Sequence, residues 1–266
     1  MKIAVIGCAG RMGRTNLRAV LDAGLELVAG VESPGHDALG RDLGTLAGGE
    51  PIGRAVTADA AAAIRAADAA IEFSGPAATV AHAEVAAAAG CAHVIGTTGL
   101  GAEDEAALAA AAERTPIVYA PNMSRGVTLL MELVETVARA LDDEFDVEVF
   151  ELHHNRKVDA PSGTALGLGR AAARGRGVAL DDVAERGRDG VTGARAPGRI
   201  GFAALRGGDV VGDHTVYVAG PGERLELTHR ATDRAIYGRG AVQAARWAVG
   251  RAPGLYGMAD VLGLGR

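Results

Sequence analysis

The 266-residue sequence has few aromatic side chains and no excess of positive charge. Phe, Trp and Tyr make up 3% of the chain, which leaves little ring surface on which nucleic-acid bases could stack. The formal net charge of −6 argues against a nucleic acid or an anionic membrane as a partner, because both select a basic surface. A small anionic substrate is still compatible with this composition, because it needs only local positive charge.

Cysteine and long apolar runs are also scarce. Cys8 and Cys91 are too few for a disulfide framework and lack the spacing of metal ligands, so no metal is predicted. No segment reaches the roughly 20 apolar residues of a membrane span. The opening residues, "MKIAVIG", enter a glycine-rich turn too early for a signal peptide. We therefore expect a cytoplasmic protein without a membrane partner.

The first 122 residues alternate between short apolar runs and helical segments. The runs typical of buried strands lie at 2–6, 25–32, 68–73, 92–99 and 116–122, and the helical segments lie at 14–24, 58–67, 77–90 and 102–113. Alternation of this kind predicts an α/β fold with a doubly wound, Rossmann-like parallel sheet.

The pattern changes after residue 122. A long helix is expected at 126–141, and "FDVEVFELHH" alternates with the period of two that is typical of an antiparallel strand. Further strand-like runs lie between 200 and 230, and a helical tail at 240–250 could return to the first domain. We predict a dinucleotide-binding domain at 1–124 plus 234–266, and a second α+β domain with an open mixed sheet at 125–233.

The segment "IGCAGRMG" places Gly7, Gly10 and Gly13 between a strand and a helix. Glycines at this spacing let the backbone turn tightly and approach a pyrophosphate, which the helix N-terminus then binds. Arg11 can add charge-assisted bonds to phosphate. In a chain with 39 glycines the same triplet could be only a packed turn, but Glu32, about 20 residues on, ends the next strand where a ribose would bind.

The residues around Glu32 leave the choice of dinucleotide open. A carboxylate accepts bonds from the ribose hydroxyls of NAD and repels a 2′-phosphate unless a cation offsets it. Ser33 and Pro34 follow, so NADH should bind at least as well as NADPH, although Arg11 or Arg14 could reach a 2′-phosphate. Turns at two later strand ends, 96–99 and 120–124, offer further cofactor contacts from Thr97, Thr98 and Asn122, since ligands lie at that edge of a parallel sheet.

The segment "ELHHNRKVDAPSGTAL", residues 151–166, concentrates proton carriers and donors. His153, His154 and Lys157 follow a strand and can exchange protons or bind anions. Ser162 resembles a helix N-cap, so the amides of Gly163 and Thr164 could bind a carboxylate. The alternative is a polar surface loop followed by an ordinary cap. A metal site is less favoured, because adjacent histidines on a strand face opposite ways.

With these motifs, the sequence resembles the dihydrodipicolinate reductases, also called 4-hydroxy-tetrahydrodipicolinate reductases, of bacterial lysine and diaminopimelate biosynthesis. The resemblance runs the whole chain, through "GCAGRMGR", "IEFSGPAAT", "VIGTTG", "APNMSRGV", "HHNRKVDAPSGT", "IGFAALRGGDVVGDHTV" and "GLYGMADVLGL". The H-H-x-x-K-x-D-A-P-S-G-T run is specific to that family, whereas a glycine triplet is common to many dinucleotide-binding proteins.

The resemblance implies NAD(P)H-dependent reduction of a small cyclic dicarboxylate, with hydride added at C4 and a proton at C3. It implies that His153 is the acid/base, that Lys157 is the proton donor, and that His154 binds substrate with Ser162, Gly163 and Thr164. The implied cofactor contacts are Gly7, Cys8, Ala9, Gly10, Arg11, Met12, Glu32, Gly96, Thr97, Thr98, Ala120, Pro121, Asn122 and Met123. It also implies that the second domain binds substrate and builds a homotetramer.

Three positions depart from the family pattern. Many members carry arginine after the ribose-binding acid, where this chain has Ser33, and this puts a strong preference for NADPH in doubt. Met123 stands where an aromatic residue is common, and Pro121 where a small one is. Two rival hypotheses are another two-domain dehydrogenase, such as an aspartate or homoserine dehydrogenase, and a non-catalytic NAD-binding protein. Neither accounts for His153 together with Lys157.

Overall fold

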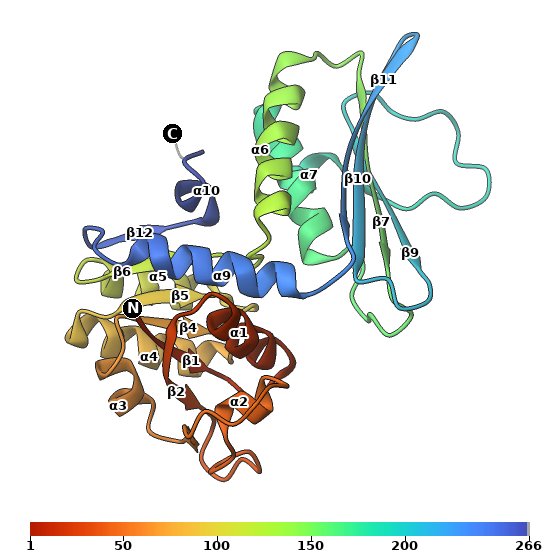
Figure 1. Ribbon diagram of the computed structural model, residues 1–266. Coiled ribbons are helices and arrows are strands. Elements are labelled where there is room, and N and C mark those ends of the chain that lie inside the picture. The colour runs from red at the N-terminus through yellow and green to blue at the C-terminus, as the bar shows by residue number, and fades with distance from the viewer. Residues whose placement is uncertain (265–266) are drawn as a thin grey trace. The chain divides into compact units, whose positions relative to one another are not determined.

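The computed structural model in Figure 1 describes residues 1–264. The chain divides into two compact units. Unit 1 contains Met1–Arg125 and the segment that begins at Arg234, and unit 2 contains Gly126–Asp233. In the described part of the chain, no helix combines the length and the apolar character needed to cross a bilayer.

Unit 1 is built on a seven-stranded sheet in the order β12-β6-β5-β4-β1-β2-β3, and every pair in it is parallel. The strands are β1 (Lys2–Ile6), β2 (Glu26–Val31), β3 (Val56–Thr57), β4 (Ala69–Glu72), β5 (Ala92–Ile95), β6 (Pro116–Tyr119) and β12 (Gly254–Tyr256). The chain leaves β1 toward β2 and later returns to β4 on its other side. Such a switch in strand order opens a crevice at the carboxyl ends of the strands.

Helices cover both faces of this sheet. They are α1 (Arg11–Asp22), α2 (Leu43–Leu46), α3 (Ala60–Arg65), α4 (Pro76–Ala89), α5 (Ala102–Ala112), α9 (Ala235–Ala248) and α10 (Met258–Val261). Ile3 and Val5 of β1 belong to the core that contains α1 and α9, whereas Ala4 and Ile6 point to the opposite core under α3 and α4. A strand that is buried on both faces has apolar residues at successive positions, which is why the residues "IAVI" at 3–6 predicted a buried parallel strand.

Unit 2 has a five-stranded sheet in the order β11-β10-β7-β9-β8. Its elements are α6 (Arg125–Ala140), β7 (Asp146–His153), α7 (Gly163–Gly175), α8 (Leu180–Val183), β8 (Ala184–Arg186), β9 (Ile200–Arg206), β10 (Gly212–Gly220) and β11 (Glu223–Ala231). The central strand β7 is antiparallel to β10 and parallel to β9, so the sheet is mixed. The two sheets together confirm the predicted fold class.

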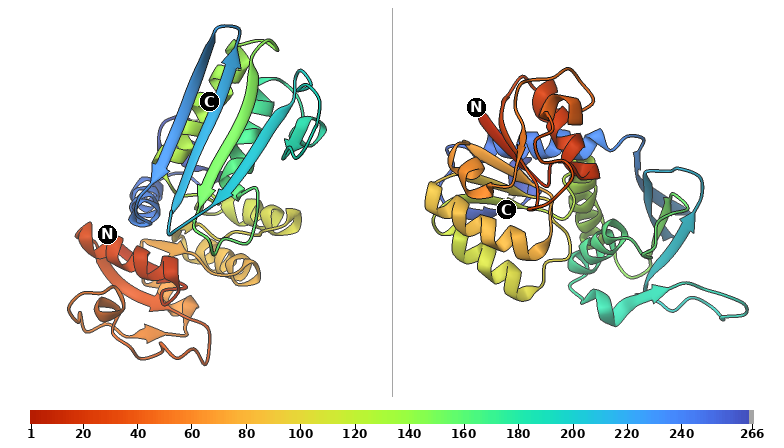
Figure 2. Two further views of the ribbon diagram at one scale, coloured as in Figure 1. Left: turned by 90° about the vertical axis from the view of Figure 1, so that its right-hand side faces the viewer. Right: turned by 90° about the horizontal axis from the view of Figure 1, so that it is seen from below.

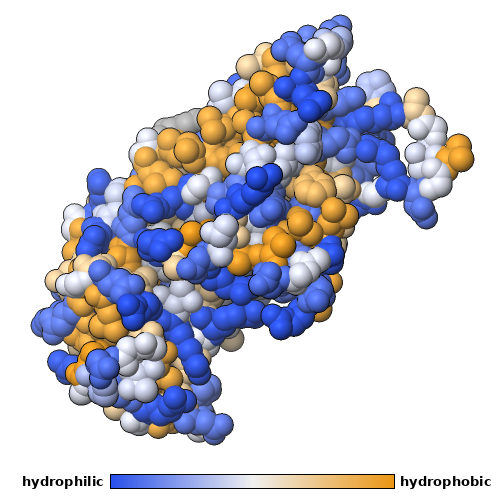
Figure 3. Space-filling view, turned by 45° about the vertical axis from the view of Figure 1, so that its right-hand side comes forward, coloured by the Kyte–Doolittle hydropathy of each residue, from blue (hydrophilic) through white to orange (hydrophobic). Residues whose placement is uncertain are grey.

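One face of the unit 2 sheet packs against α6 and α7, as Figure 2 (left) shows with these helices behind the strands. The opposite face carries Leu205 of β9, whose side chain is 50% exposed. Figure 3 shows the hydrophobic residues that gather in patches between charged ones on one side of the molecule.

Every second side chain of strand β7 is buried, and this buried row runs from the apolar core to a polar cluster. Val147 and Val149 are buried in the unit 2 core, and Glu151 and His153 continue the same buried row. Successive side chains on a strand point to opposite faces, so these four share one face of the sheet. The strand thereby carries two ionisable groups directly beyond an apolar core.

Several short elements were not predicted. The strands β3, β8 and β12 have two or three residues each, and the helices α2, α8 and α10 have four. A helix of four residues has only about one turn, and a strand of two or three residues has at most one full alternation of its side chains. Their hydrophobic pattern therefore cannot be distinguished from that of a loop.

Candidate active site and dinucleotide pocket

The glycine loop after β1 needs glycine for two reasons. Gly7 has φ +73°, and a Cβ at this position would lie 2.5 Å from the carbonyl oxygen of Phe73. A Cβ on Gly13 would collide with the carbonyl oxygen of Gly7. The loop is thus pressed between β4 and the first turn of α1, as in a close strand-to-helix turn.

The backbone amides of this loop divide into two groups. Those of Gly7 and Cys8 donate to the carbonyl of Val31 (2.9 and 3.1 Å), and that of Ala9 donates to Oε1 of Glu32 (2.7 Å). The amides of Arg11 and Met12 belong to the first turn of α1, where helix geometry provides no acceptor. A helix N-terminus of this kind suits a pyrophosphate, so the residues present fit a dinucleotide.

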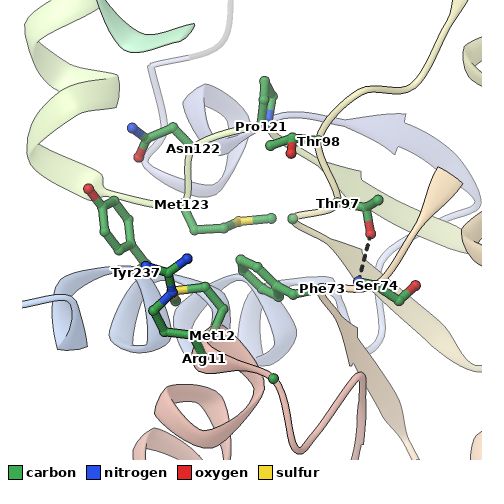
Figure 4. Close-up of a pocket in the computed structure, with 12 residues that line it drawn as sticks. Arg11, Met12, Phe73, Ser74, Thr97, Thr98, Pro121, Asn122, Met123 and Tyr237 are labelled. Atoms are coloured by element: carbon green, nitrogen blue, oxygen red, sulfur yellow. Dashed lines mark hydrogen bonds between the residues drawn. The ribbon is translucent and has the colours of Figure 1, made fainter. Parts of the chain in front are cut away.

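A pocket of about 420 Å³, here called the strand-end pocket, opens beside this turn. It is lined by Gly10, Arg11, Met12, Phe73, Ser74, Gly96, Thr97, Thr98, Pro121, Asn122, Met123 and Tyr237. Figure 4 shows Arg11, Met12 and Tyr237 at one end, and Ser74 and Thr97 at the other, where the Ser74 amide donates to Thr97 Oγ1 (3.2 Å). The structure therefore brings together the predicted residues from three separate strand ends.

A second pocket, of about 480 Å³, shares Gly10, Phe73 and Ser74 with the first. Its lining includes Glu32, Ser33, Pro34, His36 and His82. We call it the Glu32 pocket. Two pockets that meet at a glycine loop are suited to the two halves of a dinucleotide, with the adenosine half toward Glu32.

Some predicted cofactor contacts lie outside these linings. Cys8, Ala9 and Ala120 are buried in the core of unit 1. Burial raises the pKa of the Cys8 thiol to about 12, so it stays protonated. These three residues therefore support the loops rather than present side chains to a ligand.

The sequence analysis did not single out three residues that line the strand-end pocket, Phe73, Ser74 and Tyr237. Phe73 and Ser74 directly follow β4, and this position at the carboxyl end of a parallel strand could have indicated that they line a ligand pocket. Tyr237 comes from α9, far along the chain, and no local pattern connects it with the glycine loop.

In unit 2, three neighbouring strands bring a second set of polar residues together. His214 on β10 pairs with Glu151 on β7, and Arg206 on β9 pairs with His153. Cross-strand partners on one face have neighbouring side chains. Sequence reasoning missed Glu151, Arg206 and His214, although the two-residue spacing from His153 could have drawn attention to Glu151.

Glu151 is the centre of this cluster and is 1% exposed. The amide of Ser162 donates to both of its carboxylate oxygens at 3.1 Å, and the Arg206 guanidinium donates to Oε1 at 3.3 and 3.4 Å. His153 Nδ1 lies 3.5 Å from Oε2, and His214 Nε2 lies 3.8 Å from it. The carboxylate therefore holds the start of α7 through the Ser162 amide, and both imidazoles lie beside it.

The surroundings of both imidazoles favour the neutral form. Burial lowers the pKa of His153, an effect that Glu151 opposes and that the charges of Lys157 and Arg206 reinforce. Burial, with the neighbouring His153, lowers the pKa of His214 to about 3. The two rings meet edge to face with centroids 5.0 Å apart, so a proton on one disfavours a proton on the other.

The remaining predicted residues lie beside this cluster. Lys157 Nζ forms an ion pair with both carboxylate oxygens of Asp159 (2.8 and 2.9 Å). The predicted Ser cap is confirmed, because Ser162 Oγ accepts from the Ala165 amide at 3.1 Å and α7 begins at Gly163. His154 follows β7, and its amide donates to the carbonyl of Val210 (2.8 Å).

Glu151, His153 and His214 also place potential metal-ligand atoms within 4.8 Å of one another. The carboxylate, however, already accepts from Arg206 and from the Ser162 amide. A metal cation would have to displace the guanidinium and lie beside its positive charge. The chemistry of the cluster suits an anion bound near Arg206 and Lys157 better than it suits a metal.

Two family models match the chain. The model described as "Dihydrodipicolinate reductase, N-terminus" matches residues 1–123, and "Dihydrodipicolinate reductase, C-terminus" matches residues 126–262. The 4-hydroxy-tetrahydrodipicolinate reductase of Parvibaculum lavamentivorans is 59% identical over 266 residues, covering 99% of this chain and 98% of the relative. That of Ruegeria pomeroyi is 57% identical over 263 residues, covering 98% of both.

Solved structures show a similar fold. A dihydrodipicolinate reductase from a Paenisporosarcina species, with dipicolinate bound, has a TM-score of 0.78 and 22% identity and covers 98% of both chains. An amine dehydrogenase from Mycobacterium smegmatis has a TM-score of 0.57 and 18% identity, covering 95% of this chain and 94% of its own. The family models span both units and the curated relatives are more than half identical, so the chain belongs to the dihydrodipicolinate reductase family.

Proposed function

We propose that this protein uses NADH or NADPH to reduce dihydrodipicolinate, formed from 4-hydroxy-tetrahydrodipicolinate, to tetrahydrodipicolinate. Family membership supports the reaction and its place in diaminopimelate and lysine biosynthesis. The observation that carries the assignment is the buried Glu151–His153 pair beside Arg206 and the N-terminus of α7. This arrangement supplies proton chemistry and positive charge, which a dinucleotide-binding protein without catalysis has no reason to keep.

The substrate assigned to unit 2 is a compact dicarboxylate. The amides of Gly163 and Thr164 lie in the first turn of α7, where a carboxylate is favoured by the helix dipole. Lys157 adds a positive charge nearby, and we assign His154 and Ser162 to the same binding region. The relative from Paenisporosarcina, whose structure contains dipicolinate, makes a pyridine-type dicarboxylate a reasonable model for this ligand.

The proton chemistry is assigned to His153 and Lys157. The carboxylate of Glu151 favours a proton on Nδ1 of His153, which leaves Nε2 to exchange a proton with substrate or solvent. Any positive charge that develops on the ring is stabilised by Glu151. Lys157 brings an ammonium proton to the same region, and its pairing with Asp159 must loosen before it donates to a ligand. When bound to unit 1, the dinucleotide supplies the hydride.

An enzymatic assay tests the proposal. Enzymatically generated dihydrodipicolinate is mixed with the purified protein and NADH or NADPH, and loss of absorbance at the reduced-nicotinamide band is followed. We expect turnover with this substrate. With aspartate or homoserine, and NAD+ or NADP+ in place of the reduced dinucleotide, we expect no rise in the same absorbance. Binding of NADH without turnover would instead favour a non-catalytic binding protein.

We also propose a cytoplasmic homotetramer, on the grounds of family resemblance. The face of the unit 2 sheet opposite α6 and α7, with Leu205 50% exposed, supports an assembly role because exposed apolar surface often marks subunit contacts. Sedimentation equilibrium should give about four times the 26.9 kDa mass of one chain. A single-chain mass across micromolar concentrations would contradict the proposal.

The role of Glu32 is tested by a substitution that preserves its contact with the glycine loop. Glu32 Oε1 accepts from the Ala9 amide at 2.7 Å, so Glu32→Ala would disturb the loop for every dinucleotide. Glu32→Gln keeps an acceptor oxygen but removes the negative charge. We expect the Kd for NADH to rise about tenfold, through loss of a charge-assisted hydrogen bond, and that for NADPH to change less or to fall.

The measurement is titration of NADH and NADPH fluorescence with wild-type and variant protein. Glu26→Ala is the matched control, because Glu26 is an exposed carboxylate at the other end of β2. It should leave both affinities within about twofold, as expected for an exposed site away from the ligand. Equal losses for the two dinucleotides in Glu32→Gln would remove Glu32 from ribose recognition.

A further inference from the structure

Glu72 is a charged residue in unit 1 that the proposed chemistry does not use. It ends β4 and is fully buried, whereas the next two residues, Phe73 and Ser74, line both pockets. A buried carboxylate is costly unless hydrogen bonds and opposite charges compensate for its lost hydration. Its partners therefore indicate what it holds in place.

Two histidines contact different oxygens of the Glu72 carboxylate. His82 Nδ1 lies 2.8 Å from Oε1, and His93 Nε2 lies 2.8 Å from Oε2. Burial alone would raise the pKa of Glu72, but the hydrogen bonds from the two histidines outweigh it and lower the pKa to about 2. Glu72 is therefore ionised and can only accept hydrogen bonds, so both rings donate an N–H to it.

Two hydroxyl groups contact Oε1 of the same carboxylate. Ser74 Oγ donates to Glu72 Oε1 at 2.5 Å, and Thr79 Oγ1 donates to Thr97 Oγ1 at 2.8 Å while lying 3.3 Å from Oε1. Thr97 Oγ1 also accepts from the Ser74 amide at 3.2 Å. Since this oxygen accepts twice, the hydroxyl hydrogen of Thr97 must point away from both donors.

The residue between Glu72 and Ser74 is tightly enclosed. The carbonyl of Phe73 lies against Gly7, and a Cβ on Gly96 would collide with the ring of Phe73. Phe73 thus fills the space between the loops that follow β1 and β5. A shift of Ser74 would move Phe73 against one loop or the other. The hydrogen bond from Ser74 to Glu72 therefore fixes the positions of Phe73 and Ser74, which line both pockets.

We propose that Glu72 is a positioning residue for dinucleotide binding, acting through Ser74 and Thr97. It accepts the hydrogen bond from the Ser74 hydroxyl and so holds the Phe73–Ser74 turn in place. The amide of the same turn donates to Thr97 Oγ1, which helps set Thr97 as a donor in the strand-end pocket. Such a donor fits a carbonyl or hydroxyl oxygen of the nicotinamide half. This inference rests on the proposed use of NAD(P)H and adds a residue that touches neither the cofactor nor the substrate.

The test compares Glu72→Gln, Glu72→Asp and Thr115→Val by NADH fluorescence titration, steady-state kinetics and thermal melting. In Glu72→Gln the side-chain amide brings its own N–H groups into a cluster of donors. We expect the Kd and KM for NADH to rise about tenfold, with kcat at saturating NADH within about threefold. Glu72→Asp keeps the charge and should restore most of the affinity.

Thr115→Val is the matched control, because Thr115 is a buried hydroxyl of unit 1 that donates to the Cys91 carbonyl (2.9 Å) outside both pocket linings. It should lower the melting temperature without changing the affinity for NADH. If folded Glu72→Gln binds NADH as tightly as wild type, the inference is wrong.

Should Glu72→Gln fail to fold, Ser74→Ala tests the same link. It removes only the hydroxyl that joins the turn to Glu72, and it should weaken NADH binding several-fold. Unchanged binding in Ser74→Ala would then overturn the inference. Failure of the wild-type protein to bind NADH is a different result, because it would refute the proposed function itself.

Discussion

His153→Gln should lower kcat about 10³-fold, the size of effect typical when a general acid or base is removed. Glutamine approximates the size of the imidazole and can hydrogen-bond to Glu151, but it cannot take up or release a proton near neutral pH. The NADH affinity should stay within about twofold, since the residues that line the two dinucleotide pockets belong to unit 1, whereas His153 belongs to unit 2. Steady-state kinetics and NADH titration measure the two quantities separately.

The pH profile distinguishes proton transfer from a merely structural effect. Burial lowers the pKa of His153 from its ordinary value of 6.5, so the inflection that His153 imposes on kcat/KM should lie below pH 6.5. This inflection should be missing from His153→Gln. His229→Gln, on β11 of the same unit, is the matched control and should keep both rate and inflection. Near-normal turnover of His153→Gln would remove it from the acid/base role.

The sequence predicts much of the fold because unit 1 is built from strands buried on both faces. The run "IAVI" at residues 3–6 is apolar at every position because helices cover both sides of the sheet, as they do around Ile3 and Ala4. The glycine loop was also predictable, because Gly13 packs against Gly7 and Cys8 within a few residues and Gly7 has a positive φ. The contact of Gly7 with Phe73, in contrast, depends on the arrangement of β1 and β4.

The polar cluster of unit 2 could be predicted only in part. His153 was found from the sequence because it belongs to a recognisable segment, and the alternation along β7 places Glu151 on the same face. The other partners depend on strand register. Arg206 and His214 meet this pair only because β9 and β10 flank β7 with a particular alignment, and no local pattern specifies that alignment.

The Glu72 cluster could not be predicted from the sequence, because its members also come from different elements. His82 and His93 belong to a helix and to the neighbouring strand, and both converge on Glu72 from different elements. In the sequence, each is an isolated histidine in an alanine-rich segment. Such a pattern predicts only a solvated or packed side chain. Only the three-dimensional arrangement shows that these residues form one buried network under the pockets.

Lys157→Met is the second substitution with a large expected effect, a loss of about 10³-fold in kcat/KM. Methionine preserves an unbranched side chain but removes both the charge that attracts a carboxylate and the proton to be delivered. Lys157→Arg separates the two roles, because arginine keeps the charge yet does not release its proton. We expect Lys157→Arg to have a KM near that of wild type and a kcat reduced about 10²-fold.

Asp159→Asn is the control for these variants. Asp159 is the ion-pair partner of Lys157 and is largely exposed, so its replacement alters the same contact without removing the ammonium group. Steady-state rates for Asp159→Asn should stay within about fivefold of wild type, because exposed ion pairs contribute little. If Asp159→Asn were as inactive as Lys157→Met, the ion pair itself would be required. A kcat of Lys157→Arg equal to wild type would show that position 157 contributes only charge, and the proton would then have to come from His153.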